Sequence, residues 1–191
     1  MSHRSFRSFC ILINTSLLLI LSACRQESPA TVPLTNMRLF DLKAYFQQEA
    51  ASLTAKKPQL RKRLEIDGRI EEQTLDSVDF SEELRLFAEA DINRPAWLDK
   101  YAVDSLMQNG RLSRLTYHAL EADLKTRELQ IDFVDGKVRE IHIHKKFDTA
   151  IANTDQKLAY YPGKGYSIEN RQKTVLQEPQ VFRVEVVVSE Q

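Results

Sequence analysis

Residues 129–143, Leu129-Gln130-Ile131-Asp132-Phe133-Val134-Asp135-Gly136-Lys137-Val138-Arg139-Glu140-Ile141-His142-Ile143, decide the fold, because they hold two alternating segments joined by Asp135-Gly136. An Asp-Gly step between such segments is typical of a β-hairpin. The apolar residues on both sides of the step have odd numbers: Leu129, Ile131 and Phe133 before it, Ile141 and Ile143 after it. A three-residue loop that pairs residue 133 with 137 places both sets on one face. We therefore predict a type I turn with a bulge glycine.

Two further stretches repeat this pattern, namely Ile66-Asp67-Gly68-Arg69-Ile70 and Gln108-Asn109-Gly110-Arg111-Leu112. The same parity relates Leu64 and Ile66 to Ile70, so we expect the same turn in each hairpin. It also relates Tyr101, Val103 and Met107 to Leu115, Tyr117 and Ala119. Alternation then predicts strands at 156–161, 166–174 and 180–188. The last segment is apolar on both sides near its end, which predicts a central strand or one covered on both faces.

Two segments have helical rather than alternating periodicity. Residues 36–56 place apolar side chains three or four apart, with Thr35 or Asn36 as the expected cap. Residues 79–92 begin with Asp79 and Glu82, which resemble a capping pair. The apolar stripes are Leu39, Leu42, Phe46, Ala50 and Leu53 in the first helix, and Phe80, Leu84 and Phe87 in the second. We predict an α+β domain over 36–191, with about nine antiparallel strands in a curved, meander-like sheet and two amphipathic helices on one face.

The first residues read as an export signal, with Arg4 and Arg7 before an apolar run that reaches Leu21. Its end, Leu21-Ser22-Ala23-Cys24, resembles the lipobox of bacterial lipoproteins, which signal peptidase II cleaves. The resemblance implies removal of residues 1–23, diacylglycerol and N-acylation (palmitate) on Cys24, and a tether over 24–35. Several acyl chains hold a protein stably on a membrane. Arg25 stands where the family places Asp in proteins kept at the inner membrane, so we expect the outer membrane, with the periplasmic or surface side left open.

The composition limits the partners. The chain has 27 Lys and Arg against 27 Asp and Glu, and losing the signal leaves a slight acidic excess. Such a balance predicts no binding to nucleic acid or to anionic lipid. The two cysteines are Cys10, which leaves with the signal, and Cys24, which is acylated in this interpretation. The mature domain is therefore expected to have neither a disulfide nor thiol chemistry.

The histidines of His142-Ile143-His144 are the first candidate site, because alternate residues of a strand share a face. The predicted register places Glu128 opposite His142. His118 shares that face but lies two strands away, ~9–10 Å, too far for an undistorted tetrahedral site. We interpret His142, His144 and Glu128 as solvated strand residues, with a transition-metal site as the alternative.

A second candidate is the loop around Pro162-Gly163-Lys164-Gly165. Tyrosine supplies contact area at low entropic cost, so this loop could bind a partner through Tyr160, Tyr161, Lys164 and Tyr166. The alternative is a hairpin whose tyrosines pack against the rim of the sheet. The Gly-Lys-Gly sequence lacks the spacing of a phosphate-binding loop.

The sequence contains none of the Gly-x-Ser-x-Gly, His-Glu-x-x-His, Cys-x-x-Cys or dinucleotide motifs, so we expect no enzyme activity and no cofactor. Our first hypothesis is a non-catalytic lipoprotein that binds an envelope protein. The second is a carrier or sensor of an apolar ligand in a half-barrel under a helical lid, which fails if the helix side chains fill the sheet's concave face. The third, a metal-dependent enzyme, fails if zinc leaves stability unchanged and His142→Ala behaves as wild type.

Overall fold

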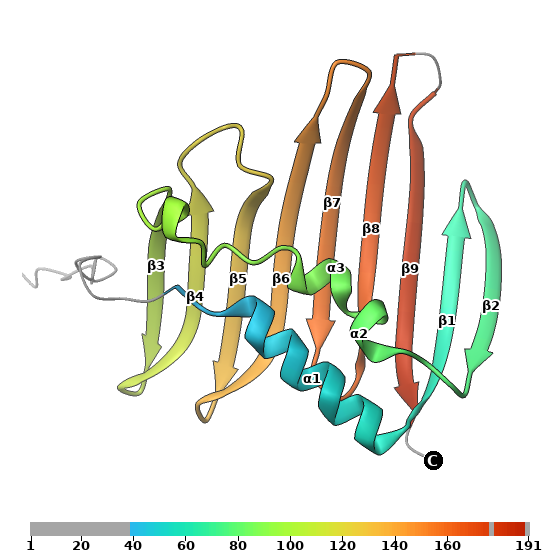
Figure 1. Cartoon of the computed structure of the whole chain (residues 1–191), viewed down its shortest axis with the longest axis horizontal. Helices are drawn as coiled ribbons and strands as arrows, with labels where there is room; N and C mark the ends of the chain where they lie inside the picture. The colour runs from blue at the N-terminus through green and yellow to red at the C-terminus, as the bar shows by residue number, and fades with distance from the viewer. Residues whose placement is uncertain (1–38, 176–177, 190–191) are drawn as a thin grey trace, which may run out of the picture.

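The computed structural model describes residues 39–175 and 178–189, which form one open sheet of nine antiparallel strands with a few helical turns on one face (Figure 1). The lipobox, Cys24 and the tether lie outside these residues. The fold is mainly β, and the predicted α+β arrangement agrees with it roughly. The strands are β1 (Gln59–Ile66), β2 (Arg69–Leu75), β3 (Tyr101–Gln108), β4 (Arg111–Ala119), β5 (Thr126–Val134), β6 (Lys137–Asp148), β7 (Ala152–Tyr161), β8 (Gly165–Thr174) and β9 (Gln180–Ser189).

The strand order is β2-β1-β9-β8-β7-β6-β5-β4-β3. The chain builds the β1–β2 hairpin at one edge, crosses the helix-covered face to the opposite edge, and returns as a meander from β3 to β9. The last strand, β9, pairs with both β8 and β1. This confirms the prediction of a central strand. The alternative of cover on both faces is wrong, because Val186 is the one buried residue of β9.

The first helix, α1 (Leu42–Lys56), begins later than predicted. Its N-cap is Asp41, whose Oδ1 accepts a hydrogen bond of 2.9 Å from the Ala44 N–H. A carboxylate in this position satisfies an amide that has no partner within the helix. The predicted caps Thr35 and Asn36 lie outside the described residues. The predicted apolar stripe is confirmed, since Leu42, Phe46, Ala50 and Leu53 are all buried.

The second predicted helix is two short pieces, α2 (Phe80–Glu83) and α3 (Arg85–Ala88), separated at Leu84. Asp79 caps α2 as predicted, because its Oδ1 accepts from the Ser81 and Glu82 N–H groups. The capping pair is only half formed, since the Glu82 carboxylate pairs with Arg85 at 3.0 Å. A 3-10 turn (Pro95–Trp97) follows before β3.

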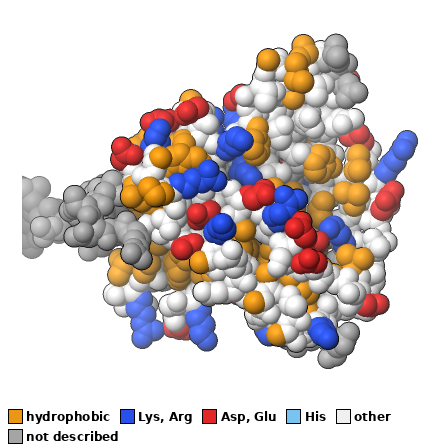
Figure 2. Space-filling model, in the orientation of Figure 1, with side chains coloured by type: hydrophobic (Ala, Val, Ile, Leu, Met, Phe, Trp, Pro, Cys, Tyr) orange, Lys and Arg blue, Asp and Glu red, His pale blue; other side chains and the backbone are white. Residues whose placement is uncertain are grey.

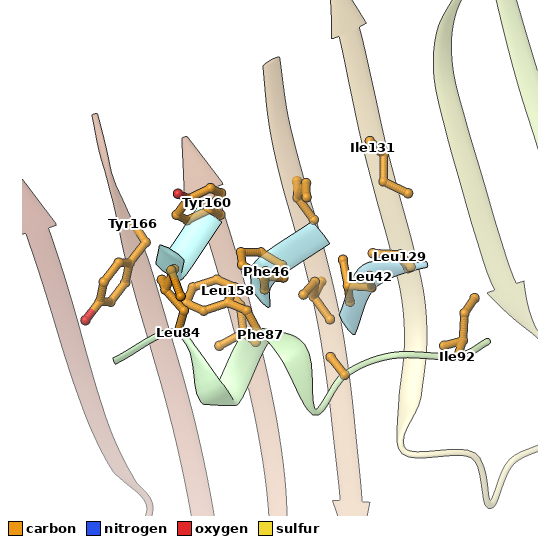
Figure 3. Packing of buried hydrophobic residues seen from close by; sticks show 14 of the residues in the cluster. Leu42, Phe46, Leu84, Phe87, Ile92, Leu129, Ile131, Leu158, Tyr160 and Tyr166 are labelled. Carbon is orange, nitrogen blue, oxygen red and sulfur yellow. The ribbon is translucent and has the colours of Figure 1, made fainter. Parts of the chain in front are cut away.

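The core fills the space between these helices and the sheet (Figure 3). The Phe46 ring lies 5.2 Å from Phe87 and 5.0 Å from Tyr160, and Phe87 lies 5.3 Å from Tyr166, between ring centroids. Burial of each such side chain contributes about 1.5–3 kcal/mol. The six helix-layer side chains that decide the carrier hypothesis are all buried in this core: Leu39, Leu42, Phe46, Phe80, Leu84 and Phe87.

All three predicted hairpins are present, but the predicted turn type is wrong. Each loop has two residues, because Ile66 pairs with Arg69, Gln108 with Arg111 and Val134 with Lys137. Both loop residues have positive φ, for example +50° at Asp135 and +76° at Gly136. This is the type I′ turn, whose twist matches that of the strands and which Asp-Gly and Asn-Gly favour.

A β-bulge one step beyond the turn restores the parity that the turn alone would break. Asp132 pairs with Glu140 and Phe133 with Val138, so Arg139 is an extra residue in β6. Ile131 and Ile141 therefore do lie opposite one another on the core face, each fully buried. Ser113 is the corresponding extra residue in β4.

The β1–β2 hairpin has no bulge, and the predicted parity fails there. Ile70 pairs with Glu65, whereas Leu64 pairs with Glu71. Ile70 therefore lies on the face away from Leu64 and Ile66. Ile66 and Ile70 are 45% and 52% exposed, so no core at this end of the hairpin selects one face.

The bulge makes a testable prediction about deletions within β6. Removing Arg139 leaves Asp132 opposite Glu140 in an unbroken ladder, so the free energy of unfolding should change by less than ~2 kcal/mol, measured by urea denaturation. Removing His142, three residues along the same strand, turns Ile141 or Ile143 away from the core and should cost on the order of 2–5 kcal/mol. Equal costs for the two deletions would contradict this account of the register.

Candidate binding groove on the open sheet face

The helices cover one face of the sheet, and the other face carries a groove of about 660 Å³. Its floor is low because Ala159 of β7 and Ser167 of β8, which are cross-strand partners, have small side chains. Longer polar side chains on β5, β6, β8 and β9 rise beside them. The groove is lined by Glu128, His142, Ile143, His144, Lys157, Leu158, Ala159, Ser167, Ile168, Glu169, Arg183, Val184 and Glu185.

One row of ionisable residues crosses the groove from strand to strand. Successive strand pairings place these side chains directly opposite one another: His118, Glu128, His144, Lys157, Glu169, Arg183 and Glu65. Directly opposed side chains of unlike charge stabilise neighbouring strands. The unlike charges of this row therefore stabilise one another on a face that is exposed to solvent.

Several members of the row are paired with each other. His118 Nδ1 lies 3.2 Å from Glu128 Oε2, and Arg183 Nε lies 3.0 Å from Glu169 Oε2. Hydrogen bonds from Arg183, then from Arg171, lower the pKa of the Glu169 carboxyl. Lys157 and Glu185 differ, because neither forms an ion pair with any described residue. Both charges can therefore meet groups on a partner, and Glu185 also acts electrostatically on Arg183.

A buried carboxylate, Asp132 of β5, lies on the same face beyond the groove. Arg114 donates to both of its oxygens, at 2.5 and 3.2 Å, and Arg139 lies 3.6 Å away. Burial alone would raise the pKa of Asp132, but the hydrogen bonds and charge of Arg114 outweigh it and hold the pKa below its usual value. The bulge at Arg139 thus contributes a guanidinium to this network.

Asp132, Glu140 and His142 bring their potential ligand atoms within 4.8 Å of one another. This set differs from the predicted metal candidates, of which only His142 belongs to it. His144 Nε2 instead pairs with Asp155 at 3.0 Å. The two arginines already neutralise Asp132, so a divalent cation would have to displace them. The arrangement therefore fits a structural ion network better than a metal centre.

The predicted partner of Glu128 is wrong by two residues. Glu128 lies opposite His144, and Gln130 lies opposite His142, because the hairpin has a two-residue loop and a bulge instead of the predicted three-residue loop. Even so, Glu128, His142 and His144 all line the groove. The sequence placed these three side chains on one polar face, which the structure confirms.

The tyrosine loop divides between the two faces of the sheet. Tyr160 and Tyr166 are buried in the core, so the structure excludes them from a partner-binding loop surface. Their hydroxyls donate to Glu49 and Glu83 respectively, and burial followed by these hydrogen bonds raises both pKa values. Tyr161 lies on the open face, 6.1 Å from the His142 ring, and Lys164 is exposed in the turn.

Sequence reasoning missed the groove floor and its cationic wall. Ala159, Ser167, Lys157 and Arg183 alternate with core residues in their strands, which was a usable signal for the face they occupy. Which of them are neighbours depends on how β7, β8 and β9 pair, and the sequence of a single strand does not determine that pairing. A second hollow, of about 670 Å³, lies between α1 and residues 81–95, and no strand residue lines it.

No known protein-family model matches the chain, and neither a curated protein nor a solved structure shows significant similarity to it. Across residues 39–175 and 178–189, the helices are too short or too polar to cross a membrane. The site is therefore interpreted from its own chemistry.

The Asp132 network makes a prediction about pH. Because the pKa of Asp132 is lower in the folded than in the unfolded chain, its contribution is present above the unfolded value, about 3.9, and is lost as the pH falls through the folded value. Asp132→Asn should cost about 1–3 kcal/mol at pH 7, by leaving two arginines without their anion. The variant should also lose less stability than wild type between pH 5 and pH 2, followed by urea denaturation.

Asp104→Asn is the matched control, since Asp104 lies on the same face but is 64% exposed. It should change stability by less than about 0.5 kcal/mol. If Asp132→Asn is as mild as this control, the network does not support the fold.

Proposed function

We propose that this chain is a lipid-anchored, non-catalytic binding module of the bacterial envelope, and that its open-face groove receives a segment of another envelope protein. The observation that carries the proposal is the groove itself. It lies on the face that the helices leave uncovered, and its lining charges are not used by the core. The finer description of the fold, a curved α+β sheet with two helices, belongs to the same proposal.

The mixed charge of the groove favours a protein segment over other ligands. Glu128, Glu169 and Glu185 lie beside Lys157 and Arg183, so neither sign dominates. Nucleic acid requires a surface with a clear basic excess. A protein segment with a basic and an acidic side chain could pair with Glu185 and Lys157, which form no ion pair with the described residues. Tyr161 beside His142 adds aromatic area next to the groove.

Anchoring rests on the resemblance of Leu21-Ser22-Ala23-Cys24 to a lipobox. The segment from Cys24 to the first described residue, Leu39, has 14 intervening residues, which can reach roughly 45 Å when extended. A tether of that reach lets the groove meet partners away from the lipid surface. Arg25 supports outer-membrane sorting, and the side of that membrane stays open.

The other two hypotheses receive less support. The carrier needs a cavity beneath the helices, but the side chains that would surround it pack against each other and against Tyr160. The metal-dependent enzyme needs accessible ligands, whereas Arg114 and Arg139 occupy Asp132.

The anchoring predicts a lipidated N-terminus. Mass spectrometry of the chain expressed in a bacterium should find the mature protein beginning at Cys24 with the mass of a diacylglycerol and one further acyl chain. Cys24→Ser should leave the signal attached and abolish the added lipid. Cys10→Ser, within the signal, should behave as wild type. An unmodified N-terminus in the wild-type chain would contradict the proposal.

The groove predicts a specific contact in the cell. A photoreactive amino acid at Ser167, on the groove floor, should cross-link to one envelope protein, whereas the same group at Glu72 on β2 should not. Ala159→Trp fills the groove and should reduce the Ser167 cross-link at least tenfold, because the partner segment no longer fits.

Thr74→Trp is the matched control, since it adds the same ring to an exposed position on β2. It should leave the cross-link unchanged, and urea denaturation should show both tryptophan variants folded. Cross-linking to lipid alone would contradict a protein partner in the groove. A protein cross-link that survives Ala159→Trp would place the contact outside the groove.

A further inference from the structure

The two edges of the sheet differ in how they are protected. The edge strand β2 carries Arg69, Glu71 and Glu72, and charges on an edge discourage pairing with another chain. The other edge strand, β3, has one charged residue, Asp104, and carries Leu106 and Met107 near its end, each 56% exposed. Figure 2 shows hydrophobic side chains gathered on the side of the molecule where Figure 1 places β3. An edge of this kind is open to strand addition.

The backbone of β3 presents a regular set of groups to a partner. The Leu120 N–H donates to the Lys100 carbonyl at 2.9 Å, so residue 100 faces β4. Hydrogen bonding in an antiparallel ladder alternates along the strand, so residues 102, 104 and 106 also face β4. The N–H and C=O groups of Tyr101, Val103, Ser105 and Met107 therefore point away from β4, where no described strand pairs with them.

We propose that β3 pairs antiparallel with β3 of a second copy, about a two-fold axis at Ser105, to form one continuous sheet. This register opposes Ser105 to Ser105 of the other copy, Val103 to Met107, and Asp104 to Leu106. The interface is the same patch on both copies, as a two-fold dimer requires. Val103 and Met107 lie on the core side of β3. Val103 of each copy therefore packs against Met107 of the other, which gives two such contacts.

Charge and overlap select this register among the neighbouring ones. Moving the axis to Asp104 would oppose two like carboxylates directly, which is unfavourable. Moving it to Leu106 shortens the overlap to residues 104–108. The axis at Ser105 joins residues 102–108 and gives each Asp104 an uncharged neighbour. A second copy fits this edge because Val103 and Met107 lie two residues on either side of Ser105, so that each meets the other across the two-fold axis.

The dimer does not compete with the groove. The groove lies on β5 to β9, and the proposed interface lies at β3. Two grooves would therefore remain open in one assembly. This inference does not depend on the proposed function, because it concerns a different edge of the sheet and a different partner.

Single cysteine variants test the register directly in cells that express the full chain. With the axis at Ser105, the two Cα atoms of residue 105 are hydrogen-bonded partners, about 5.5 Å apart, which suits a disulfide. Ser105→Cys should therefore move most of the protein to a disulfide-linked dimer on a non-reducing gel. Asp104→Cys and Leu106→Cys should not, because their copies are diagonal neighbours about 7–8 Å apart. The wild-type chain is the control for any disulfide that Cys10 or Cys24 forms.

Two matched pairs of variants test the contact without a disulfide, by light scattering of the detergent-solubilised protein. Ser105→Pro removes an outward N–H, and Met107→Lys puts a charge into the apolar pair; each should convert the dimer to monomer. Glu72→Pro and Ile70→Lys change the β2 edge in the same way and should leave the dimer intact. Urea denaturation checks that all four fold.

Each alternative outcome overturns a defined part of the proposal. Cross-linking at residue 104 or 106 in place of 105 overturns the Ser105 register. A wild-type chain that is monomeric overturns the dimer, whether the edge stays free or residues 25–38 of the same chain cover it. A dimer that survives Ser105→Pro and Met107→Lys but fails in the β2 variants places the interface at the opposite edge.

Discussion

The structure depends on keeping the two faces of one sheet distinct, and a single extra residue in β6 does this. A two-residue Asp135-Gly136 turn would place the apolar residues of β5 and β6 on opposite faces. The bulge at Arg139 restores them to one face, so Ile131 and Ile141 meet in the core. The same bulge brings the Arg139 guanidinium near Asp132 on the other face. The bulge at Arg139 thus determines which side chains of β6 face the core and which lie on the open face.

Separation of the faces explains where a binding function can lie. The helix-covered face has its space filled by rings from α1, α3, β7 and β8, with Phe46, Phe87 and Tyr160 in mutual contact. Even the hydroxyls on that side are used, since Tyr160 and Tyr166 donate to Glu49 and Glu83. Within residues 39–175 and 178–189 no such layer covers the open face, where Lys157 and Glu185 form no ion pair. We therefore propose the open face as the surface for recognition.

Much of this could be predicted from the sequence, because local patterns determine local structure. The Asp-Gly and Asn-Gly steps placed three hairpins, and the helical stripes placed Leu42, Phe46 and Phe87 in the core. The turn type was missed, because the parity of the apolar residues was attributed to the loop and not to a bulge. The groove was missed because it joins β5 to β9, and the partner of each residue depends on register. The loop length and the bulge each shifted the register by one residue, which changed the partner of Glu128 from His142 to His144.

The pairing of β9 with β1 is the least local feature, and both faces reinforce it. On the open face, Arg183 of β9 reaches Glu169 of β8 and Glu65 of β1. On the covered face, Glu83 of α2 spans Val186, because it accepts from Tyr166 of β8 and from Lys62 of β1. The β1–β2 hairpin thus joins the meander only once the last strand is in place. Contacts so distant in sequence carry a large loop-closure cost, and the side-chain contacts on both faces help to offset it.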